Sequence, residues 1–497
     1  MSAVRLEAAT LDQVPGAVAV PRYDRAALRT GIVHLGVGGF HRAHQARYLD
    51  ELMNDGQALD WALCGVGVLP SDIRMRDALS AQDGLYTLVV KEPDGTWSAR
   101  VIGSLHQYLF APDDPEAVVE KMAEAGVRIV SLTVTEGGYN VSPVTGEFLA
   151  DTPGVVHDLT TGTAPTTSFG LVVEALVRRR ARGLAPFTVM SCDNIAGNGD
   201  VARRSFAAFA ALKGQAGGDA ELGEWVRTQV HFPNSMVDRI TPATTDEDRA
   251  EVARRFGVDD AWPVVCEPFT QWVLEESFTA GRPPFEQVGV QVVQDVEPYE
   301  LMKLRLLNAS HQALCYLGHL AGYQLVHEVA QDPLFAEFLL SYMDVEATPT
   351  LQPVPGIDLE DYKRTLIVRF SNAGVRDTVA RLCAESSDRI PTWLLPVVRE
   401  NLAHGGQVHR AALVVASWAR YAEGTDEHGG SITVVDRLAD RLQAAAGRQS
   451  TEPLAFLRDR ELFGDLVDEP RFTGPYLAAL DSLHRVGARA TLQALQL

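Results

Sequence analysis

The order in which apolar patterns follow one another is the strongest constraint on this fold. In the first part of the chain, short apolar runs rich in β-branched residues alternate with stretches of helical spacing. Alternating strands and helices are typical of a parallel sheet with helices on both faces. The predicted strands are 32–37, 61–68, 128–135, 187–191 and 288–293. The predicted helices among them are 43–55, 115–125, 169–182 and 201–212.

The pattern changes after Val293. From Pro298 onward nearly every segment has helical spacing, as in "LFAEFLLSYMD", "AALVVASWARYAEG", "ITVVDRLADRLQAAAG" and "PYLAALDSLHRVG". Glycine and prolines in the preceding stretch "GRPPFEQVGVQVVQDVEP" interrupt regular structure there. We therefore expect two domains, an α/β domain over residues 1–293 and a mostly α-helical domain over residues 294–497.

A glycine-rich turn follows the first predicted strand, in "GIVHLGVGGFHRAH" at residues 31–44. Glycines let the backbone approach a pyrophosphate, and the next helix offers free N–H groups at its N-terminus. The third glycine of the G-x-G-x-x-G pattern is missing, because position 41 is histidine. Such a turn alone is often structural, but its place on the first strand of an alternating pattern favours cofactor binding. We predict a Rossmann-type dinucleotide-binding domain whose cofactor contacts include Gly36, Gly38, Gly39 and Phe40.

Polar residues end the other predicted strands. Asp72 follows "DWALCGVGV", where a carboxylate can bind ribose hydroxyls and repel a 2′-phosphate, so we predict NAD rather than NADP. The spacing fits equally well a cap, by Ser71 or Asp72, of the helix that follows. Glu136 lies in the turn "TEGGY" and Asn194 ends "VMSCDN". Ligands of open parallel sheets lie beyond the carboxyl ends of the strands, so these turns should face one crevice, with Glu136 at the cofactor.

The helical stretch "YELMKLRLLNASHQALCYLGH", residues 299–319, carries polar residues among leucines. At 100° per residue, four of them share about 140° of one face: Glu300, Lys303, Asn308 and His311. Burial among apolar groups lowers the pKa of a lysine, which can then accept a proton near neutral pH. The alternative is a partly solvated face from which the lysine reaches water. The position of this face at the start of the second domain favours a catalytic lysine.

Two shorter motifs do not fit the chemistry that they first suggest. Tyr299 and Lys303 have the spacing of the catalytic pair of short-chain dehydrogenases, but they open a helical domain and the nearest upstream serine, Ser277, is too distant for that pattern. The stretch "HRAH" holds two histidines without a third ligand at a known zinc spacing, so we expect no metal. None of the five cysteines belongs to a C-x-x-C pair, which predicts reduced thiols.

Composition excludes several classes of partner. The formal net charge of -21 opposes binding to nucleic acid or to an anionic membrane. No apolar run approaches the ~18 residues of a membrane span, and the N-terminus lacks the apolar core of a signal peptide. We expect a cytoplasmic protein that acts on a small molecule.

Several motifs together resemble the polyol-specific long-chain dehydrogenases from about residue 30 to the C-terminus. They are "GIVHLGVGGFHRAHQ", "LCGVG", "VSLTVTEGGY", "FTVMSCDN", "FPNSMVDRITP", "WPVVCEPFTQWVLE", "KLRLLNASH" and "PVPGIDLEDYK". The resemblance implies an NAD-dependent, metal-independent enzyme that interconverts a polyol and a ketose, with D-mannitol and D-fructose as the expected pair. It also implies a monomer, since members of this family are often monomeric.

The resemblance further implies roles for individual residues. The family's catalytic lysine, asparagine and histidine match Lys303, Asn308 and His311. A second oxyanion-binding asparagine matches Asn194, and a glutamate near a proton exit path matches Glu300. The implied substrate contacts are Asp238 in "MVDR", Arg381 in "VARLC" and Arg389, where relatives carry a lysine. Relatives often have two adjacent acidic residues where this chain has Ser71 and Asp72, so exclusion of NADP is less secure.

Other activities stay open. Within the family, the chain could be a D-arabinitol 4-dehydrogenase or a fructuronate reductase, and the second of these would need an additional cation for the substrate carboxylate. A sugar-phosphate enzyme would need several basic residues at its pocket, where only Arg381 and Arg389 are candidates. The non-enzymatic alternative is a nucleotide-binding sensor without turnover. The intact set of lysine, asparagine and histidine argues against a sensor.

Overall fold

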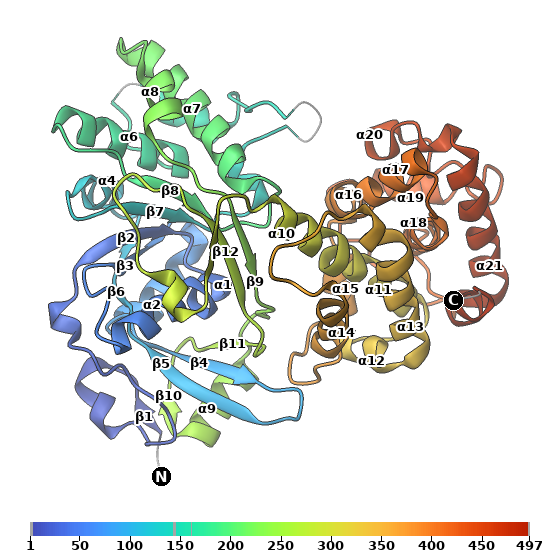
Figure 1. Ribbon diagram of the computed structural model, residues 1–497, viewed down its shortest axis with the longest axis horizontal. Helices are drawn as coiled ribbons and strands as arrows, with labels where there is room; N and C mark the ends of the chain where they lie inside the picture. The colour runs from blue at the N-terminus through green and yellow to red at the C-terminus, as the bar shows by residue number, and fades with distance from the viewer. Residues whose placement is uncertain (1–2, 143–145, 161, 496–497) are drawn as a thin grey trace. The chain divides into compact units, whose positions relative to one another are not determined.

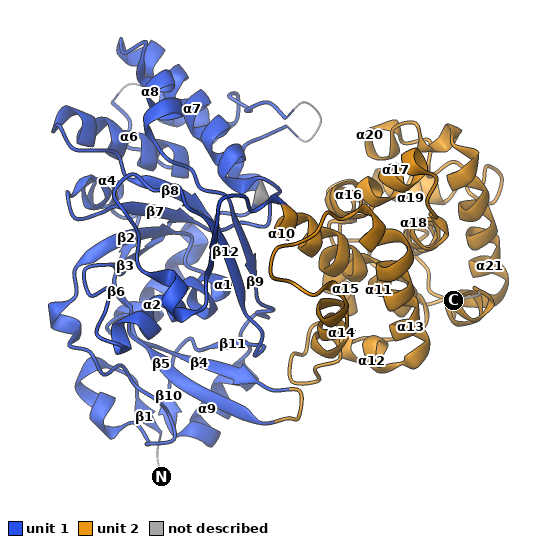
Figure 2. Cartoon of the chain, viewed as in Figure 1, with its two compact units in different colours: residues 1–92, 96–297 blue, residues 93–95, 298–497 orange. Residues whose placement is uncertain are grey.

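The computed structural model describes residues 3–142, 146–160 and 162–495 (Figure 1). The chain divides into two compact units (Figure 2). Unit 1 comprises residues 1–92 and 96–297, and unit 2 comprises residues 93–95 and 298–497. Among the described residues, no helix is both long enough and apolar enough to cross a membrane.

Unit 1 is built on a five-stranded parallel sheet. Its strands, in spatial order, are β6 (Leu105–Phe110), β3 (Ala62–Gly67), β2 (Thr30–Leu35), β7 (Ile129–Leu132) and β8 (Thr188–Ser191). Neighbouring strands pair in parallel throughout, so their carboxyl ends lie along one edge. The strands β2, β3, β7 and β8 are buried along their whole length, as expected for a sheet covered on both faces.

Successive residues of these strands enter two different apolar cores. Val33 of β2 packs in one core with Phe169 of α6 (Ser168–Ala181), whereas Ile32 packs in the other with Leu49 of α2 (Gln45–Asn54). This alternation follows from the two-residue period of a strand and produces the predicted helical layers. The helices of unit 1 are α1 (Gly39–Ala43), α2 (Gln45–Asn54), α3 (Ile73–Ser80), α4 (Pro115–Ala123), α5 (Pro153–Leu159), α6 (Ser168–Ala181), α7 (Asn198–Gly217), α8 (Leu222–Gln229) and α9 (Asp246–Phe256).

Smaller sheets flank the central one. The strands β9 (Ser235–Asp238), β12 (Gln271–Glu275) and β13 (Gln291–Val293) form one of them, in the order β13-β12-β9. The strands β11 (Val264–Cys266), β4 (Tyr86–Lys91) and β5 (Trp97–Ile102) form another, and β1 (Val4–Arg5) pairs with β10 (Val258–Asp259). The predicted strand 288–293 is therefore shorter than expected and lies outside the central sheet. A 3-10 turn, η5 (Phe285–Val288), replaces its beginning.

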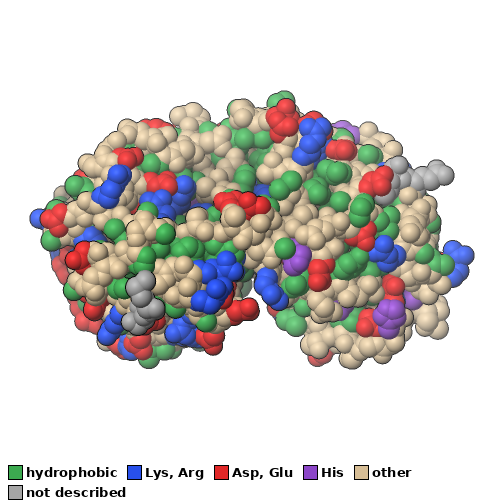
Figure 3. All heavy atoms as spheres, turned by 90° about the horizontal axis from the view of Figure 1, so that it is seen from below, with side chains coloured by type: hydrophobic (Ala, Val, Ile, Leu, Met, Phe, Trp, Pro, Cys, Tyr) green, Lys and Arg blue, Asp and Glu red, His purple; other side chains and the backbone are tan. Residues whose placement is uncertain are grey.

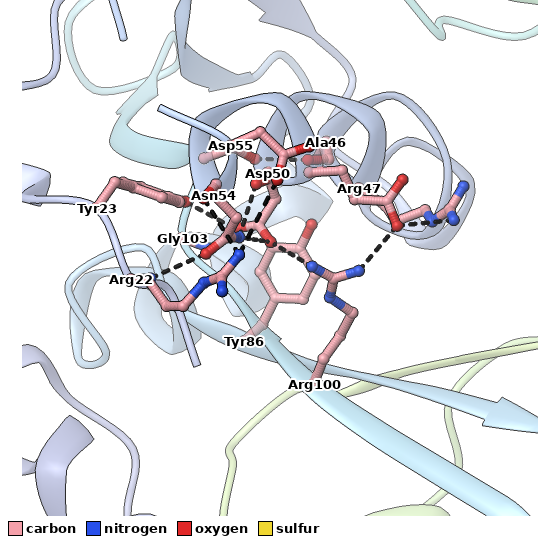
Figure 4. A network of polar contacts seen from close by, with 12 residues as sticks. Arg22, Tyr23, Ala46, Arg47, Asp50, Asn54, Asp55, Tyr86, Arg100 and Gly103 are labelled. Atoms are coloured by element: carbon pink, nitrogen blue, oxygen red, sulfur yellow. Dashed lines mark hydrogen bonds and ion pairs between the residues drawn. The ribbon is translucent and has the colours of Figure 1, made fainter. Parts of the chain in front are cut away.

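A buried carboxylate anchors helix α2. Asp50 accepts hydrogen bonds from the Tyr23 hydroxyl at 2.6 Å, the Gly103 amide at 2.9 Å and the Arg100 guanidinium at 3.1 Å (Figure 4). Burial raises the pKa of Asp50. Since a buried carboxylate is costly without partners, these contacts tie the N-terminal segment and β5 to α2.

Unit 2 is mostly helical, as predicted. Its helical segments are α10 (Glu297–Met302), η6 (Lys303–Asn308), α11 (Ala309–Leu320), α12 (Val326–Gln331), α13 (Pro333–Tyr342), η7 (Met343–Ala347), α14 (Leu359–Phe370), α15 (Val379–Cys383), α16 (Ser386–Arg389), η9 (Ile390–Leu394), α17 (Leu395–His404), α18 (His409–Tyr421), α19 (Ala439–Ala446), α20 (Arg460–Phe463) and α21 (Pro470–Ala494). Helix α11 is buried on nearly every side, so it forms the centre of this unit. Only the second half of "ITVVDRLADRLQAAAG" is helical.

Acidic and basic side chains lie interspersed on the surface shown in Figure 3. Many arginines pair with carboxylates, as Arg182 does with Glu120 at 2.8 Å and Arg282 with Glu286 at 2.6 Å. Exposed pairs of this kind contribute little to stability. On this face the two signs of charge are therefore mixed and not segregated.

Candidate active site

The predicted functional turns of unit 1 lie along the carboxyl edge of the parallel sheet. Asp72 follows β3, Gly36 follows β2, Glu136 follows β7 and Asn194 follows β8. Because the strand order is β3-β2-β7-β8, the four turns are neighbours in that order. This edge is where open parallel sheets bind their ligands. Glu136 belongs to η4 (Glu136–Tyr139), but its side chain lies outside the described part of the structure.

The two glycines of the first turn have different local requirements. Gly36 has a φ of +90°, and a Cβ there would lie 2.2 Å from the Thr133 carbonyl oxygen. Only glycine fits such a position. A Cβ on Gly38 would meet a single neighbour, the Gly36 carbonyl oxygen, at 3.9 Å, so space is open beside this backbone. Gly38 also precedes α1, in which Gly39 and Phe40 are the first residues. The turn therefore has the open backbone approach that a pyrophosphate requires.

Two buried histidines support this turn from within the unit. The Thr133 hydroxyl donates to the Gly36 carbonyl at 2.7 Å, so its oxygen accepts from His34 Nε2 at 2.9 Å. His34 Nδ1 then accepts from the Ser131 hydroxyl at 2.8 Å. The ring of His41 stacks on that of His34 with centroids 3.5 Å apart. Burial lowers the pKa of His34 to about 3 and that of His41 well below its usual value, so both rings are neutral.

The Asp72 carboxylate binds backbone amides of the turn in which Asp72 lies. One oxygen of its carboxylate, Oδ2, accepts from the backbone amides of Val68 and Leu69, each at 2.9 Å. Asp72 precedes α3 but makes no side-chain hydrogen bond to that helix. The alternative that Asp72 caps the following helix therefore does not hold. The contacts hold the carboxylate at the end of β3, where a ribose would lie in a dinucleotide-binding sheet.

Asn194 and Asp238 follow or end strands of two different sheets. Asn194 comes just after β8 and is exposed, and Asp238 ends β9 and is buried. Asn198 joins the two segments, because its side-chain nitrogen donates to the carbonyls of Asp193 at 3.0 Å and Ser235 at 2.7 Å. The structure thus brings the turn that carries Asn194 beside the strand that carries Asp238.

In unit 2, Lys303 begins a π-helical turn. The run from α10 to α11 is continuous, but residues 303–308 form η6, a π-helix that begins at Lys303 and ends at Asn308. The prediction of one regular helix is wrong here. Each turn of a π-helix holds more residues than a turn of an α-helix, so a projection at 100° per residue does not apply. Such turns are rare and frequently lie at functional sites.

The side chains of this run are buried. Glu300, Lys303 and Asn308 are 8%, 7% and 7% exposed. His311 is half-buried, and its ring centroid lies 4.5 Å from that of Phe370. The alternative of a solvated face does not fit Lys303, because so little of this residue is exposed. The Tyr299 hydroxyl donates to the Pro355 carbonyl at 2.8 Å, a structural role that argues further against a tyrosine base.

The two predicted substrate arginines have partners within unit 2. Arg381 donates through Nε to Asp377 at 2.5 Å, and the pair is bidentate. This hydrogen bonding raises the pKa of Arg381. Arg389 donates to the carbonyls of Leu382 at 3.0 Å and Arg381 at 3.3 Å, which end helix α15. Both arginines thus stabilise this short helix, and substrate contact by either one stays a prediction.

The structure also bears on metal and disulfide chemistry. Within residues 3–142, 146–160 and 162–495, no group of three or more His, Cys, Asp or Glu is placed to hold a metal ion. All the cysteines are buried free thiols, as predicted: Cys64, Cys192, Cys266, Cys315 and Cys383.

Several supporting residues were not predicted from the sequence. Asp193 stands beside Asn194 in "SCDN", and Tyr139 ends "TEGGY". A histidine inside the apolar run of β2 was a usable signal for His34, since a buried polar side chain requires a partner.

Comparison with known proteins agrees with this architecture. Residues 30–287 match the mannitol dehydrogenase Rossmann domain, and residues 295–484 match the mannitol dehydrogenase C-terminal domain. Mannitol 2-dehydrogenase of Pyrenophora tritici-repentis is 47% identical over 480 residues, which cover 96% of this chain and 83% of that protein. The Aspergillus fumigatus enzyme of the same name is 45% identical, with 99% of each chain covered.

Two solved structures are similar over nearly the whole chain. One is Pseudomonas fluorescens mannitol 2-dehydrogenase in a ternary complex with NAD and D-mannitol, with a TM-score of 0.91, 47% identity and 99% of each chain covered. The other is a substrate-free D-sorbitol dehydrogenase, with a TM-score of 0.89, 37% identity and coverage of 98% of this chain and 100% of that one. With both of its domains matched and such relatives over almost its full length, this chain belongs to the mannitol dehydrogenase family.

Proposed function

We propose that this protein interconverts D-mannitol and D-fructose with NAD, using Lys303 as the general base. The protein is an NAD-dependent polyol dehydrogenase by its family and by its 47% identity to an enzyme solved with NAD and D-mannitol. The observation that carries the mechanism is the burial of Lys303 at the first position of a π turn that ends at Asn308.

The carboxyl edge of unit 1 fits a dinucleotide. The open backbone beside Gly38 would receive the pyrophosphate, and Asp72 would bind the ribose hydroxyls and oppose a 2′-phosphate. Bound NAD supplies the hydride acceptor.

In the oxidation, Lys303 accepts the proton of the C2 hydroxyl while the hydride leaves C2, which converts the alcohol to a ketone. Burial disfavours the charged ammonium, so the lysine is available as a base. Asn194 and Asn308 donate amide N–H groups to the oxygen that gains negative charge, as an oxyanion hole does. Glu300 passes the proton onward, and His311 positions a neighbouring hydroxyl. Asp238, Arg381 and Arg389 complete the substrate contacts.

D-Sorbitol is the second candidate substrate, because a relative that is 37% identical is a D-sorbitol dehydrogenase. D-Mannitol and D-sorbitol differ only in the configuration at C2, and oxidation there gives D-fructose from either. The ketose product therefore does not distinguish the two activities, and the polyol must be varied.

Initial rates of NADH formation with D-mannitol, D-sorbitol and D-arabinitol test this proposal, together with NADH consumption with D-fructose and D-fructuronate. We expect the highest kcat/KM with D-mannitol and D-fructose, and lower values when NADP replaces NAD. A preference for another polyol would overturn the substrate assignment. NADH binding without any consumption would favour the sensor.

A further inference from the structure

The turns that follow β7 and β8 are locked together by one buried carboxylate. Asp193 is 8% exposed and comes just before the candidate oxyanion residue Asn194. Its Oδ1 accepts from the Thr135 amide at 2.9 Å. Its Oδ2 accepts from the Val134 amide at 3.1 Å and the Tyr139 hydroxyl at 2.7 Å. Every one of these donors belongs to the turn after β7, so the side chain joins two turns of the sheet edge.

The turn that Asp193 holds is strained. Thr135 has φ +64° and ψ 169°, a region that is essentially reserved for glycine. A side chain persists there only where its surroundings over-determine the backbone. The hydrogen bond from the Thr135 amide to Asp193 is a direct restraint of this kind. Such strain is often found at functional sites, and the next residue is the candidate cofactor contact Glu136.

The same turn also reaches the glycine loop. Thr133, directly before Val134, donates to the Gly36 carbonyl at 2.7 Å, and its own carbonyl leaves no room for a Cβ on Gly36. A continuous set of contacts therefore runs from the glycine loop through residues 133–135 to Asp193 and Asn194. All of it lies within unit 1.

We propose that Asp193 is a positioning residue that sets the cofactor turn after β7 and the orientation of Asn194 together. The inference rests on the proposed function for the role of Asn194, but its effect on nucleotide binding does not depend on that role. Asp193 itself need not touch substrate or cofactor, because it acts through the backbone on either side.

Asp193→Asn is a sharp test, because the geometry leaves no harmless orientation for the amide. Each carboxylate oxygen accepts from a backbone N–H, so the NH₂ group of asparagine must face one of these donors. We expect the Kd for NADH, measured by protein fluorescence, to rise about tenfold. We expect kcat with D-mannitol to fall by about tenfold to a hundredfold.

The matched control is Asp158→Asn. Asp158 is also a buried carboxylate of unit 1, and its two oxygens accept from the amides and hydroxyls of Thr166 and Thr167. It takes no part in the proposed site. We expect this variant to lower Tm while kcat and the Kd for NADH stay within about twofold, since it leaves both functional turns intact. Equal losses in the two variants would overturn the proposal, because they would indicate a general effect of removing a buried charge.

Thr135→Gly in the Asp193→Asn background supplies a second test. Glycine adopts the conformation of residue 135 without a Cβ penalty, so the turn should hold its shape without the carboxylate. We expect at least about fivefold recovery of both NADH affinity and kcat. No recovery, or an Asp193→Asn variant within about twofold of wild type in both quantities, contradicts the positioning role. If the wild-type protein oxidised no polyol, the proposed function would fail, and the NADH titrations would still decide the role of Asp193.

Discussion

The carboxyl edge of unit 1 and the lysine run of unit 2 present functional groups in opposite ways. At the sheet edge, the candidate residues lie on turns whose backbone is fixed by neighbouring side chains, as Thr133 fixes Gly36 and Asp193 fixes Thr135. In unit 2, the candidates lie inside one helical run, where burial and a π turn set their environment. In the first region, hydrogen bonds to the backbone orient the candidate residues. In the second, burial within the helical run orients them.

This difference predicts how each region responds to substitution. A turn held by a few polar contacts should lose cofactor affinity when one contact is removed. A buried helix should keep its fold when a functional side chain is shortened, while the chemistry that depends on that side chain is lost. Matched pairs of variants, one at a candidate residue and one at a structural residue of the same type, separate these outcomes.

Replacing Lys303 should have the largest effect. We expect Lys303→Ala to lower kcat for D-mannitol oxidation by about 10³–10⁴-fold, because it removes the general base. Lys363→Ala is the matched control, since Lys363 is also a buried lysine of unit 2 and its known partners, Glu360 at 2.5 Å and Asp344, lie outside the proposed site. That variant should lose stability and keep kcat within about twofold.

Added small amines should partly restore turnover to Lys303→Ala, because the truncation leaves a buried space in which another base can act. Steady-state kinetics with and without methylamine measure this rescue. A Lys303→Ala enzyme within about threefold of wild type would show that the lysine is not the base.

The second largest effect should follow loss of an oxyanion donor. Asn308→Ala should reduce kcat by about 10²–10³-fold with a smaller change in the Kd for NADH. Asn401→Ala is the matched control, because Asn401 is buried in the same unit and donates to the carbonyls of Glu346 at 2.8 Å and Val397 at 3.0 Å. It should lower the free energy of unfolding by about 1–3 kcal/mol and leave kcat unchanged. Comparable kcat losses in both variants would argue against an oxyanion role.

The sequence predicted the sheet edge better than the lysine run. Strand patterns and glycine spacing placed Gly36, Asp72 and Asn194 on turns after parallel strands, and parallel pairing brings such turns to one edge. The lysine run was predicted as a regular helix, and its π turn was missed. Periodicity does not distinguish the two, because Leu304 and Leu307 suit either geometry.

The hydrogen bonds that support the functional turns were also not predicted from the sequence. A carboxylate such as Asp193 acquires its role from partners 54 to 59 residues earlier in the chain, at positions 134, 135 and 139. The alternative of a helix cap by Asp72 could not be decided from the sequence for a related reason, since the side chain turns back to Val68 and Leu69. Local spacing predicts which groups are polar, whereas tertiary structure decides which backbone each one binds.

The two glycines of the first turn give a smaller and more local test. Gly36→Ala should destabilise the fold by about 2–3 kcal/mol, because of its positive φ and the Thr133 carbonyl 2.2 Å from the new Cβ. Gly38→Ala should fold normally, since its Cβ enters open space, and should weaken NADH binding by blocking the pyrophosphate. Urea denaturation and NADH titration of both variants measure the two effects. Unchanged NADH affinity in Gly38→Ala would indicate that the cofactor lies elsewhere.

The last expected effect is an acid sensitivity of unit 1 that arises at the buried histidine beneath the glycine turn. Burial lowers the pKa of His34 to about 3, below the value of about 6.5 in an unfolded chain. As the pH falls below 6.5, the unfolded chain binds a proton that the folded protein excludes. The stability from a neutral His34 is therefore complete above pH 6.5 and is lost progressively between pH 6.5 and 3, by about 1.4 kcal/mol per pH unit. His34→Gln should flatten this dependence in urea denaturation at pH 5 to 7, whereas His428→Gln, at an exposed position of unit 2, should not. A slope that is the same in all three proteins would mean that another group controls the acid response, and the backbone support of the cofactor turn would not depend on a neutral imidazole.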